Sequence, residues 1–437
     1  MAALLANSAV LGSTVAASAA SCSDHESRGY GFRNGHCKVG RFGRGNYLSI
    51  GGRDNFSSPW PRLSRDSMRS LAVSSFELMP PPIDNDLHVS CGADLIWDSL
   101  VMIMDSFLKE IMRDEGAEID DNGVVMTFGN DDEAIAAAEQ GVAVVDMSNY
   151  GRLRVTGDDR LHFLHNQSTA DFKTMKASQG CYTVFTTPTA RTIDLAKAWV
   201  MTNSVILVLS PNKVEIEDIT DKTYLFSITG PSSDELLRKL NLEEIIGKPF
   251  GTHLHYAVEG TPVTIAVGSG YAGEGYSMLL STSTAGFVWE TLLKSGAVPM
   301  GATAAERLRV LQGKPAPGSE LTDDYNVLEA GLWRTISLTK GCYIGQETIA
   351  KLITYNGVKQ ELWGIELEAA VTPGTPIMVD GQKVGKLTSC TIGRDNSKYF
   401  GLGYIKNKAG GAGIQVDVAG VSGTVVDIPF ITRSLPE

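Results

Sequence analysis

The chain has 437 residues, of which 43% are hydrophobic and 20% charged, a globular composition sufficient for two or three packed units. Its net charge of −12 argues against general binding to nucleic acid, because phosphates require a basic protein surface. No apolar run approaches the roughly 20 residues that a helix needs to cross a bilayer, so the sequence predicts no membrane partner.

The first 75 residues differ in composition from the rest. They begin Met1-Ala2-Ala3, are rich in Ser, Gly and Ala, and contain nine Arg or Lys against four Asp or Glu. Such a segment has too little apolar material to form a core, which predicts a disordered transit peptide. The high Ser and Gly content favours import into the chloroplast stroma, with the mitochondrion as the alternative. The remaining residues then carry a charge of about −17.

Residues 76–130 are predicted to form a linker and one helix. The stretch Glu77 to Asp86 contains three consecutive prolines, which is typical of a stiff extended linker. In residues 94–113 the apolar side chains recur at spacings of three and four, which predicts an amphipathic helix.

Residues 131–330 switch repeatedly between helical and strand periodicity. The pattern predicts an α+β body built from two related α/β halves. Residues 205–209 are apolar on both faces, so this strand is expected in the middle of a sheet. Helices are expected over residues 131–141, 158–167, 285–293 and 304–311 and from Ser232, and strands over residues 142–147, 151–156, 182–186, 193–201, 205–209, 222–228, 261–267 and 276–280.

Residues 358–437 lose the helical periodicity. Short β-runs separated by Gly and Asn turns indicate a small barrel or sandwich, and we expect a C-terminal β-barrel. The runs cover residues 361–367, 376–379, 383–391, 400–405, 414–418 and 424–428. Residues 331–357 connect this domain to the body.

The cysteines and histidines do not form a metal-binding pattern. Of six cysteines, the four outside the first 75 residues are far apart and lack CxxC spacing, which argues against structural zinc, a four-thiolate cluster or a disulfide framework. His162 and His165 are three apart on a predicted helix, and His253 and His255 alternate on a strand. Because neither pair has a third ligand in view, structural roles are favoured, and no stably bound metal is expected.

The connecting segment contains the sharpest motif of the sequence, Lys340-Gly341-Cys342-Tyr343-Ile344-Gly345-Gln346-Glu347. Gln346 and Glu347 open a predicted helix, so Cys342 would precede a helix N-terminus with Lys340 nearby, and both features lower a thiol pKa. Glu347 acts in the opposite direction. From chemistry alone, a reactive thiol and a small apolar side chain in a tight loop remain equally open.

The motif resembles the signature of the folate-binding YgfZ-type proteins, relatives of the glycine-cleavage T protein in the aminomethyltransferase superfamily. The resemblance implies a functional role for Cys342 and Lys340 within a motif that also includes Gly341, Tyr343, Gly345, Gln346 and Glu347. It covers most of residues 130–437, since residues 141–171 look like the start of a T-protein body and residues 325–332 resemble its PLEAGL stretch.

Two further segments resemble folate-contacting parts of T proteins. Gly270-Tyr271-Ala272-Gly273-Glu274 is similar to the GYTGE segment, which implies that Glu274 binds the pterin of folate. A carboxylate that accepts two N–H donors from a pterin edge is a sound bidentate arrangement. Residues 306–313 resemble the LRLEAG helix, which places Arg309 at the folate-contacting arginine.

One departure concerns catalysis. T proteins carry two adjacent acids after a glycine-rich turn, whereas this chain retains Asp194 and has Leu195 in place of the second acid. Asp194 remains a candidate folate-binding residue, but glycine-cleavage activity is not expected.

The resemblance implies a folate-dependent accessory protein for the assembly, repair or maintenance of iron–sulfur enzymes. Its cofactor would be tetrahydrofolate or a derivative, and its partners would be iron–sulfur client or assembly proteins. A folate-dependent one-carbon transferase of the aminomethyl type and a non-catalytic folate-sensing adaptor are the alternatives.

Overall fold

The structure is a computed structural model that describes residues 76–79, 94–209, 217–258, 260–271, 273–394 and 396–432. The predicted transit peptide, residues 1–75, and the prolines of the predicted linker lie outside the described residues. The first residues of that linker, Glu77–Met79, form strand β1, which pairs antiparallel with a strand near residue 255. No helix among the described residues is long and apolar enough to span a membrane.

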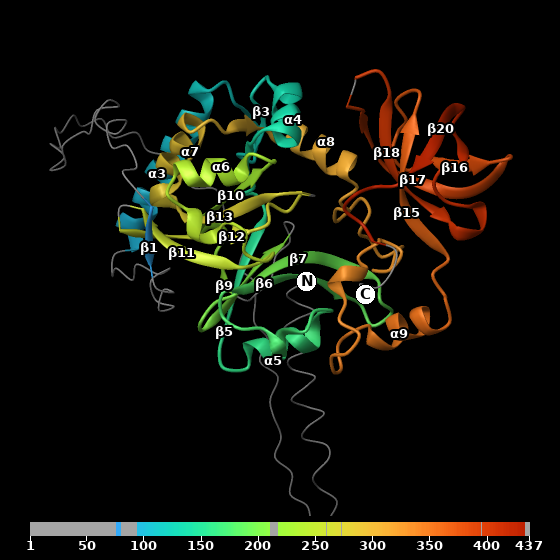
Figure 1. Cartoon of the computed structure of the whole chain (residues 1–437), viewed down its shortest axis with the longest axis horizontal. Coiled ribbons are helices and arrows are strands. Elements are labelled where there is room, and N and C mark those ends of the chain that lie inside the picture. Colours follow the sequence, from blue (N-terminus) through green and yellow to red (C-terminus); the bar gives the residue numbers. More distant parts are fainter. Residues whose placement is uncertain are drawn as a thin grey trace, which may run out of the picture. The chain divides into compact units, whose positions relative to one another are not determined.

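The body contains two sheets, shown with their covering helices in Figure 1. The larger sheet has seven strands in the order β1-β11-β12-β13-β10-β4-β14. Its remaining bounds are β11 His253–Val258, β12 Thr261–Val267, β13 Gly275–Ser281, β10 Thr223–Thr229, β4 Ala143–Asp146 and β14 Val298–Met300. Only β14 and β4 pair in parallel; the other ladders are antiparallel.

The smaller sheet has five strands in the order β6-β7-β8-β5-β9. The bounds are β6 Gln179–Thr186, β7 Thr192–Val200, β8 Ser204–Leu209, β5 Gly151–Thr156 and β9 Glu217–Asp218. The apolar strand β8 lies in the middle of this sheet, as its sequence predicts. Trp199 of β7 is fully buried in a core shared with strands of the larger sheet.

Helices cover the sheets at the positions that their periodicity predicts. The predicted N-terminal helix is present as α3, Asp94–Asp114, and packs against α7, Thr282–Lys294, where the rings of Phe107 and Phe287 lie 5.5 Å apart. The other helices are α4 Asp131–Gln140, α5 Arg160–Gln167, α6 Ser233–Lys239, α8 Ala302–Gln312 and α9 Gln346–Thr354. Trp289 of α7 is fully buried against Phe226 of the larger sheet.

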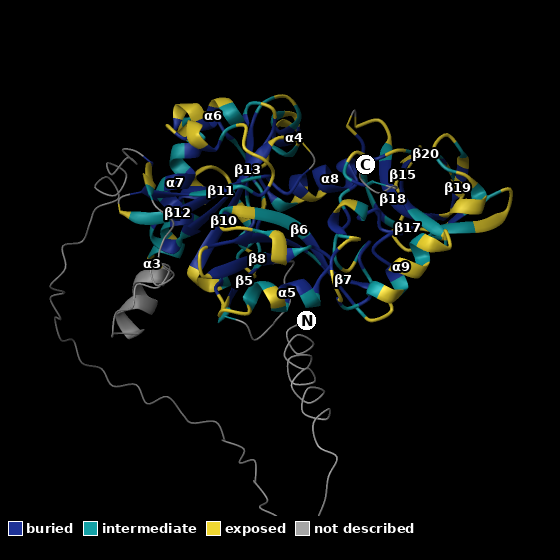
Figure 2. Cartoon of the chain, turned by 60° about the horizontal axis from the view of Figure 1, so that its bottom comes forward, coloured by how far each residue is buried: buried dark blue, intermediate teal, exposed yellow. Residues whose placement is uncertain are grey.

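The C-terminal residues form a closed six-stranded barrel in the order β15-β18-β17-β16-β19-β20. The bounds are β15 Gln360–Leu367, β16 Pro376–Val379, β17 Gln382–Ile392, β18 Tyr399–Lys406, β19 Gln415–Val418 and β20 Val421–Val426. Alternate residues such as Ile365, Leu387 and Ile405 are buried in its core. The α+β body followed by a barrel therefore confirms the predicted fold. Figure 2 shows buried residues along the strands and exposed residues mostly on turns and outer helix faces.

A separate hydrophobic cluster joins the barrel to the body. It combines residues of α8 and of the segment 321–336 with Leu362, Leu402 and Tyr404 of the barrel. The rings of Tyr325 and Tyr404 stack with centroids 3.5 Å apart. This shared core fixes the segment that carries the cysteine motif, because that segment lies between the two parts in sequence.

Candidate functional site

The predicted cysteine motif forms an anchored loop ahead of α9. Gly345 has φ of 87°, a left-handed conformation that favours glycine, and precedes the first residue of the helix. The backbone N–H of Ile344 donates to the carbonyl of Asn166 at 3.1 Å, and the hydroxyl of Thr186 donates to the carbonyl of Ile344 at 2.7 Å. The loop is thereby attached to α5 and to β6, which are about 160 residues earlier in the chain.

Lys340 is buried and fastens the start of this loop. Its ammonium donates hydrogen bonds to the carbonyl oxygens of His165, Ser168 and Ala170, the last at 2.7 Å. It also lies 4.6 Å from the ring centre of Tyr343. A cation suits this position, because these carbonyls include those at the C-terminal end of α5. All three ammonium protons are thus used to hold the structure, and the predicted catalytic role of Lys340 stays a prediction.

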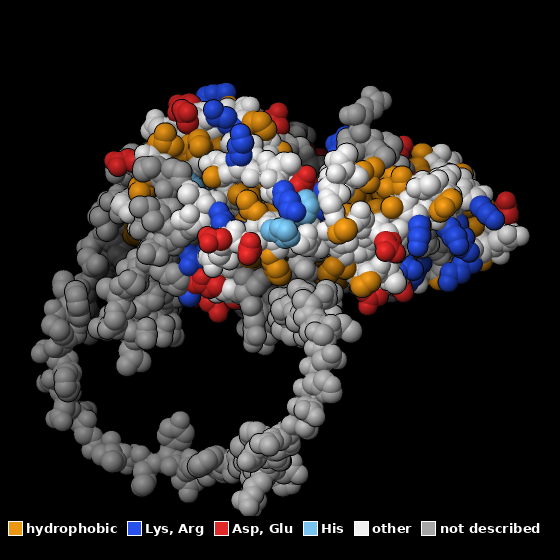
Figure 3. All heavy atoms as spheres, turned by 90° about the horizontal axis from the view of Figure 1, so that it is seen from below, with side chains coloured by type: hydrophobic (Ala, Val, Ile, Leu, Met, Phe, Trp, Pro, Cys, Tyr) orange, Lys and Arg blue, Asp and Glu red, His pale blue; other side chains and the backbone are white. Residues whose placement is uncertain are grey.

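Cys342 is exposed on the same loop. Glu347 and Gln346 follow in the first turn of α9, where the side chain of Glu347 is exposed. Figure 3 shows one face of the molecule, on which charged side chains of both signs lie among hydrophobic ones. The exposure of Cys342 makes its thiol accessible to a partner molecule.

His165 lies beside the loop, which the sequence alone does not indicate. A Cβ atom added to Gly341 would stand 3.8 Å from its Nε2 atom. The Nδ1 atom lies 3.0 Å from the carboxylate of Asp171, and burial, together with the charge of Lys340, lowers the imidazole pKa. His162, on the same helix, is exposed. Among the described residues, no group of three or more His, Cys, Asp or Glu could hold a metal ion.

Two adjoining cavities lie where the predicted folate residues Arg309 and Asp194 were expected to meet. They have volumes of about 50 and 200 Å³ and share Met147, Tyr150, Arg309 and Lys314 in their walls. The smaller cavity is also lined by Tyr182, Leu195, Lys197 and Gly270, and the larger by Tyr271 and Glu306. We call the two together the central cavity.

Arg309 lines the central cavity, but its hydrogen bonds are made within the protein. Its Nε and Nη2 atoms donate to the two carboxylate oxygens of Glu306, each at 2.7 Å. The other protons go to the carbonyl of Lys314, to Glu320 at 2.9 Å and to the hydroxyl of Ser389 at 3.0 Å. All five N–H donors therefore have acceptors, so a direct contact with folate requires one of these bonds to be exchanged.

Glu274 and Asp194 are placed differently from Arg309. Glu274 is exposed in a bend before β13, and its carbonyl accepts a hydrogen bond from the N–H of Gly230 at 3.2 Å. Asp194 is buried in β7, whereas Leu195 and Lys197 of the same strand line the central cavity. The residues lining the central cavity do not include Glu274 or Asp194, and their folate-binding roles stay predictions.

The sequence analysis missed Lys197 and Lys314. Lys197 is 7% exposed, although it lies in an otherwise apolar stretch of β7, and burial lowers its pKa to about 7. Burial also lowers the pKa of Lys314 to about 8. The available signal was a lysine between Ala196 and Ala198 in a buried strand, a position where lysine is rare.

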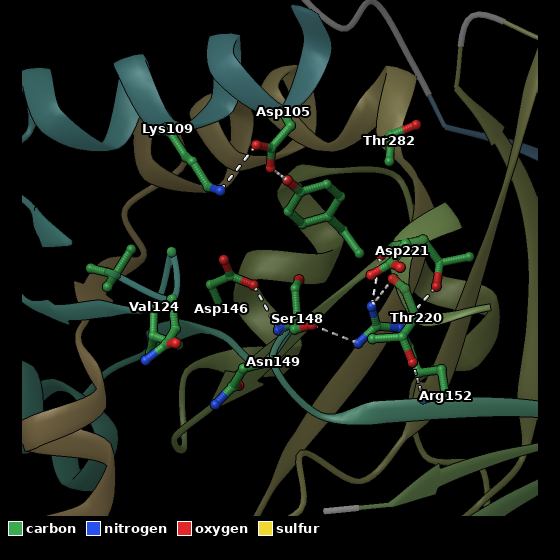
Figure 4. Close-up of a pocket in the computed structure, with 15 residues that line it drawn as sticks. Asp105, Lys109, Val124, Asp146, Ser148, Asn149, Arg152, Thr220, Asp221 and Thr282 are labelled. Atoms are coloured by element: carbon green, nitrogen blue, oxygen red, sulfur yellow. Dashed lines mark hydrogen bonds and ion pairs between the residues drawn. The ribbon is translucent and has the colours of Figure 1, made fainter. Parts of the chain in front are cut away.

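A third cavity of about 350 Å³ lies under α3 and is shown in Figure 4. Its polar groups are paired with one another. Lys109 lies 3.0 Å from Asp105, which accepts a hydrogen bond from the hydroxyl of Tyr224. Asp146 accepts from the backbone N–H of Ser148, and Arg152 donates to backbone carbonyls and to a threonine hydroxyl. This cavity holds none of the residues that the sequence singled out.

Comparison with known proteins accounts for the arrangement of body and barrel. Residues 125–340 match the GCVT N-terminal domain, and residues 360–431 match the glycine cleavage T-protein C-terminal barrel domain. A chloroplastic protein of Arabidopsis thaliana, assigned by its name to the transferases, is 49% identical over 391 residues, covering 84% of this chain and 86% of its own length.

More distant relatives are named aminomethyltransferases. The protein of Caldanaerobacter subterraneus is 29% identical over 307 residues, covering 64% of this chain and 82% of its own length. The crystal structure of glycine cleavage system aminomethyltransferase T from Bartonella henselae superposes with a TM-score of 0.66 at 18% identity, covering 76% of this chain and 99% of that one. At this identity the superposition shows a shared fold.

Proposed function

Because this chain belongs to the family of glycine-cleavage T proteins, we propose that it is a folate-dependent plastid protein that supports the assembly or repair of iron–sulfur clusters. The YgfZ-type motif at residues 340–347 supports the iron–sulfur role. The Ser-rich, basic residues 1–75 and the chloroplastic name of the Arabidopsis relative support the plastid address, with stroma as the compartment.

The exposure of Cys342 on an anchored loop is the observation that carries the proposal. A thiol fixed at the surface can take part in thiol–disulfide exchange with a partner or contact a cluster transiently. The other two described cysteines are less suited, because burial raises the pKa of Cys181 to about 12 and also raises that of Cys390.

The central cavity offers a partial fit to tetrahydrofolate, which supplies a carrier for one-carbon units when bound. Tyr150, Tyr182, Tyr271 and Leu195 provide flat and apolar walls for a ring system. Both component cavities are smaller than the roughly 300–1,000 Å³ of typical ligand pockets, so only part of a folate fits inside them. Glu274, outside the cavity, remains available to a protruding part of the ligand.

Aminomethyl transfer is the alternative activity. Leu195 lines the central cavity in place of the second acid of T proteins, so the cavity lacks that carboxylate. A folate-sensing adaptor without turnover is the other alternative. Measurable folate-dependent turnover by the purified chain would favour the transferase.

The direct test is complementation of a bacterial strain that lacks its YgfZ protein. We expect the chain to rescue this strain and Cys342→Ser to lose the rescue, while Cys181→Ser and Cys390→Ser retain it. Full rescue by Cys342→Ser at unchanged stability would show that this thiol only packs. A fluorescent fusion to residues 1–75 tests the address, and import into mitochondria alone would contradict the plastid assignment.

A further inference from the structure

Two lysine side chains converge on one glycine in the central cavity. A Cβ atom added to Gly270 would stand 3.4 Å from Nζ of Lys197 and 3.6 Å from Nζ of Lys314. The two nitrogens are therefore no farther apart than these two distances together, about 7 Å. Gly270 has φ of 97°, a conformation that favours glycine, and its missing side chain leaves this space open.

The charges of these lysines are not balanced by carboxylates. Nζ of Lys197 donates to the hydroxyl of Ser277 at 2.7 Å and to the carbonyl of Gly268 at 3.1 Å, both neutral acceptors. Nζ of Lys314 lies 5.5 Å from the ring centre of Tyr271. Within the described part of the chain, neither ammonium lies within 4 Å of a carboxylate, whereas Glu306 and Glu320 pair with Arg309.

A third cation reinforces the imbalance. Arg309 shares the walls of the cavity with Lys314 and lowers its pKa after the larger effect of burial, while Lys314 lowers that of Lys197 in the same way. Burying like charges together is unfavourable unless a counter-charge is present at least part of the time. The arrangement is therefore suited to a ligand that brings negative charge.

We propose that Lys197 and Lys314 form an anion subsite at Gly270, which binds a carboxylate or phosphate group. A charged Lys197 has three N–H donors and two protein acceptors, so one donor remains for a ligand. Two oxygens of one anion can bridge nitrogens at this separation with charge-assisted bonds of about 2.7–2.9 Å. The subsite rests on the proposed function, because the same cavity is taken to receive the folate.

The anion has two chemical sources. It is either a carboxylate of the folate glutamate or a separate small oxyanion bound beside the ring system. Isothermal titration of the full chain with three probes distinguishes them: tetrahydrofolate, tetrahydrobiopterin, which shares the pterin ring but has no carboxylate, and inorganic phosphate.

The test variants are Lys197→Met and Lys314→Met, which remove each charge at similar size. Gly270→Ala fills the space between the amines while keeping both charges, and Lys109→Met, in the third cavity, is the matched control. Circular dichroism melts establish that each variant is folded. Because Lys197 and Lys314 are tested separately, failure of one variant to fold leaves the other informative.

For a folate carboxylate, we expect each of the three subsite variants to weaken tetrahydrofolate binding at least tenfold, with tetrahydrobiopterin and the Lys109→Met control unchanged. For a separate anion, saturable phosphate binding should be lost in the same variants while tetrahydrofolate binding is kept. Phosphate binding that depends on both lysines without any tetrahydrofolate binding would refute the folate proposal and keep the subsite.

The subsite is overturned if tetrahydrofolate binds the parent and all variants equally and phosphate does not bind, an outcome that leaves the proposed function standing. Absence of saturable binding of tetrahydrofolate and phosphate to the parent also overturns it.

Discussion

Nη1 of Arg309 lies 2.9 Å from Oε2 of Glu320, a carboxylate that is fully buried between α8 and the barrel. The same carboxylate accepts hydrogen bonds from the hydroxyls of Ser389 at 2.6 Å and Thr388 at 2.7 Å, both on β17. Glu320 thus joins the helix that carries Arg309 to a barrel strand. Any role of Arg309 in ligand binding depends on this internal pairing.

Glu320→Gln should destabilise the protein by about 3 kcal/mol, because removing one partner leaves a buried charge with less compensation. Glu306→Gln, whose side chain is 58% exposed, should cost less than about 1 kcal/mol. Urea unfolding of both variants measures the difference. Equal losses would show that the buried pair has no special weight.

Gly345→Ala should distort the cysteine loop. The added Cβ atom would stand 2.5 Å from the hydroxyl oxygen of Thr186 and 2.8 Å from the carbonyl oxygen of Thr187, at a φ that alanine disfavours. We expect a loss of at least about 1–3 kcal/mol and reduced complementation. Gly341→Ala, with no atom nearer than 3.8 Å, is the control and should keep its stability. Faster proteolysis within residues 337–346 of Gly345→Ala alone would locate the effect.

Lys340→Met separates an anchoring role from a chemical one. The substitution leaves three buried carbonyl acceptors without their donor, so we expect a loss of about 2–3 kcal/mol in the absence of any ligand. Hydrogen exchange should rise in the loop and at the end of α5. A variant as stable as the parent that fails to complement would instead support direct participation of Lys340.

The buried histidines should make stability fall in acid. Burial lowers the pKa of both His253 and His255 to about 4, below the value of about 6.5 in an unfolded chain. Between these values the unfolded state binds more protons, so the stabilising contribution is present above about pH 6.5 and is lost as the pH falls toward 4. The loss amounts to about 3 kcal/mol per imidazole.

His253→Leu should therefore flatten the dependence of unfolding free energy on pH between 6.5 and 4. His162→Leu, at an exposed position, should leave the slope as it is. Denaturant titrations at pH 7.5, 6 and 5 measure both slopes. Identical slopes in the parent and His253→Leu would contradict the assignment of acid sensitivity to this imidazole.

The sequence predicted elements whose stabilising contacts follow the local pattern. Strand β16 has the predicted bounds, and β8 is central because both of its faces are apolar. The three-residue strand β14 was missed, because its place beside β4 depends on a partner 155 residues away. Strand β4 lies in the larger sheet with later strands, so the halves of the sequence do not correspond to separate sheets.

The candidate site was predicted in part for the same reason. Exposure of Cys342 agrees with a loop placed ahead of a helix start, which local patterns indicate. The three carbonyls that hold Lys340 and the meeting of Lys197 with Lys314 depend on contacts across more than 100 residues. Periodicity carries no information about such contacts.

The barrel is fastened to the body at both of its ends. Where the chain enters, the N–H of Leu362 donates to the carbonyl of Glu329 at 3.0 Å. Where it leaves, the N–H of Phe430 donates to Gln312 at 3.0 Å and that of Thr432 to Gly331 at 2.9 Å. A two-point attachment does not let the barrel swing as a lid on a single hinge. A protease cut at the entry segment should therefore leave the two fragments associated under native conditions.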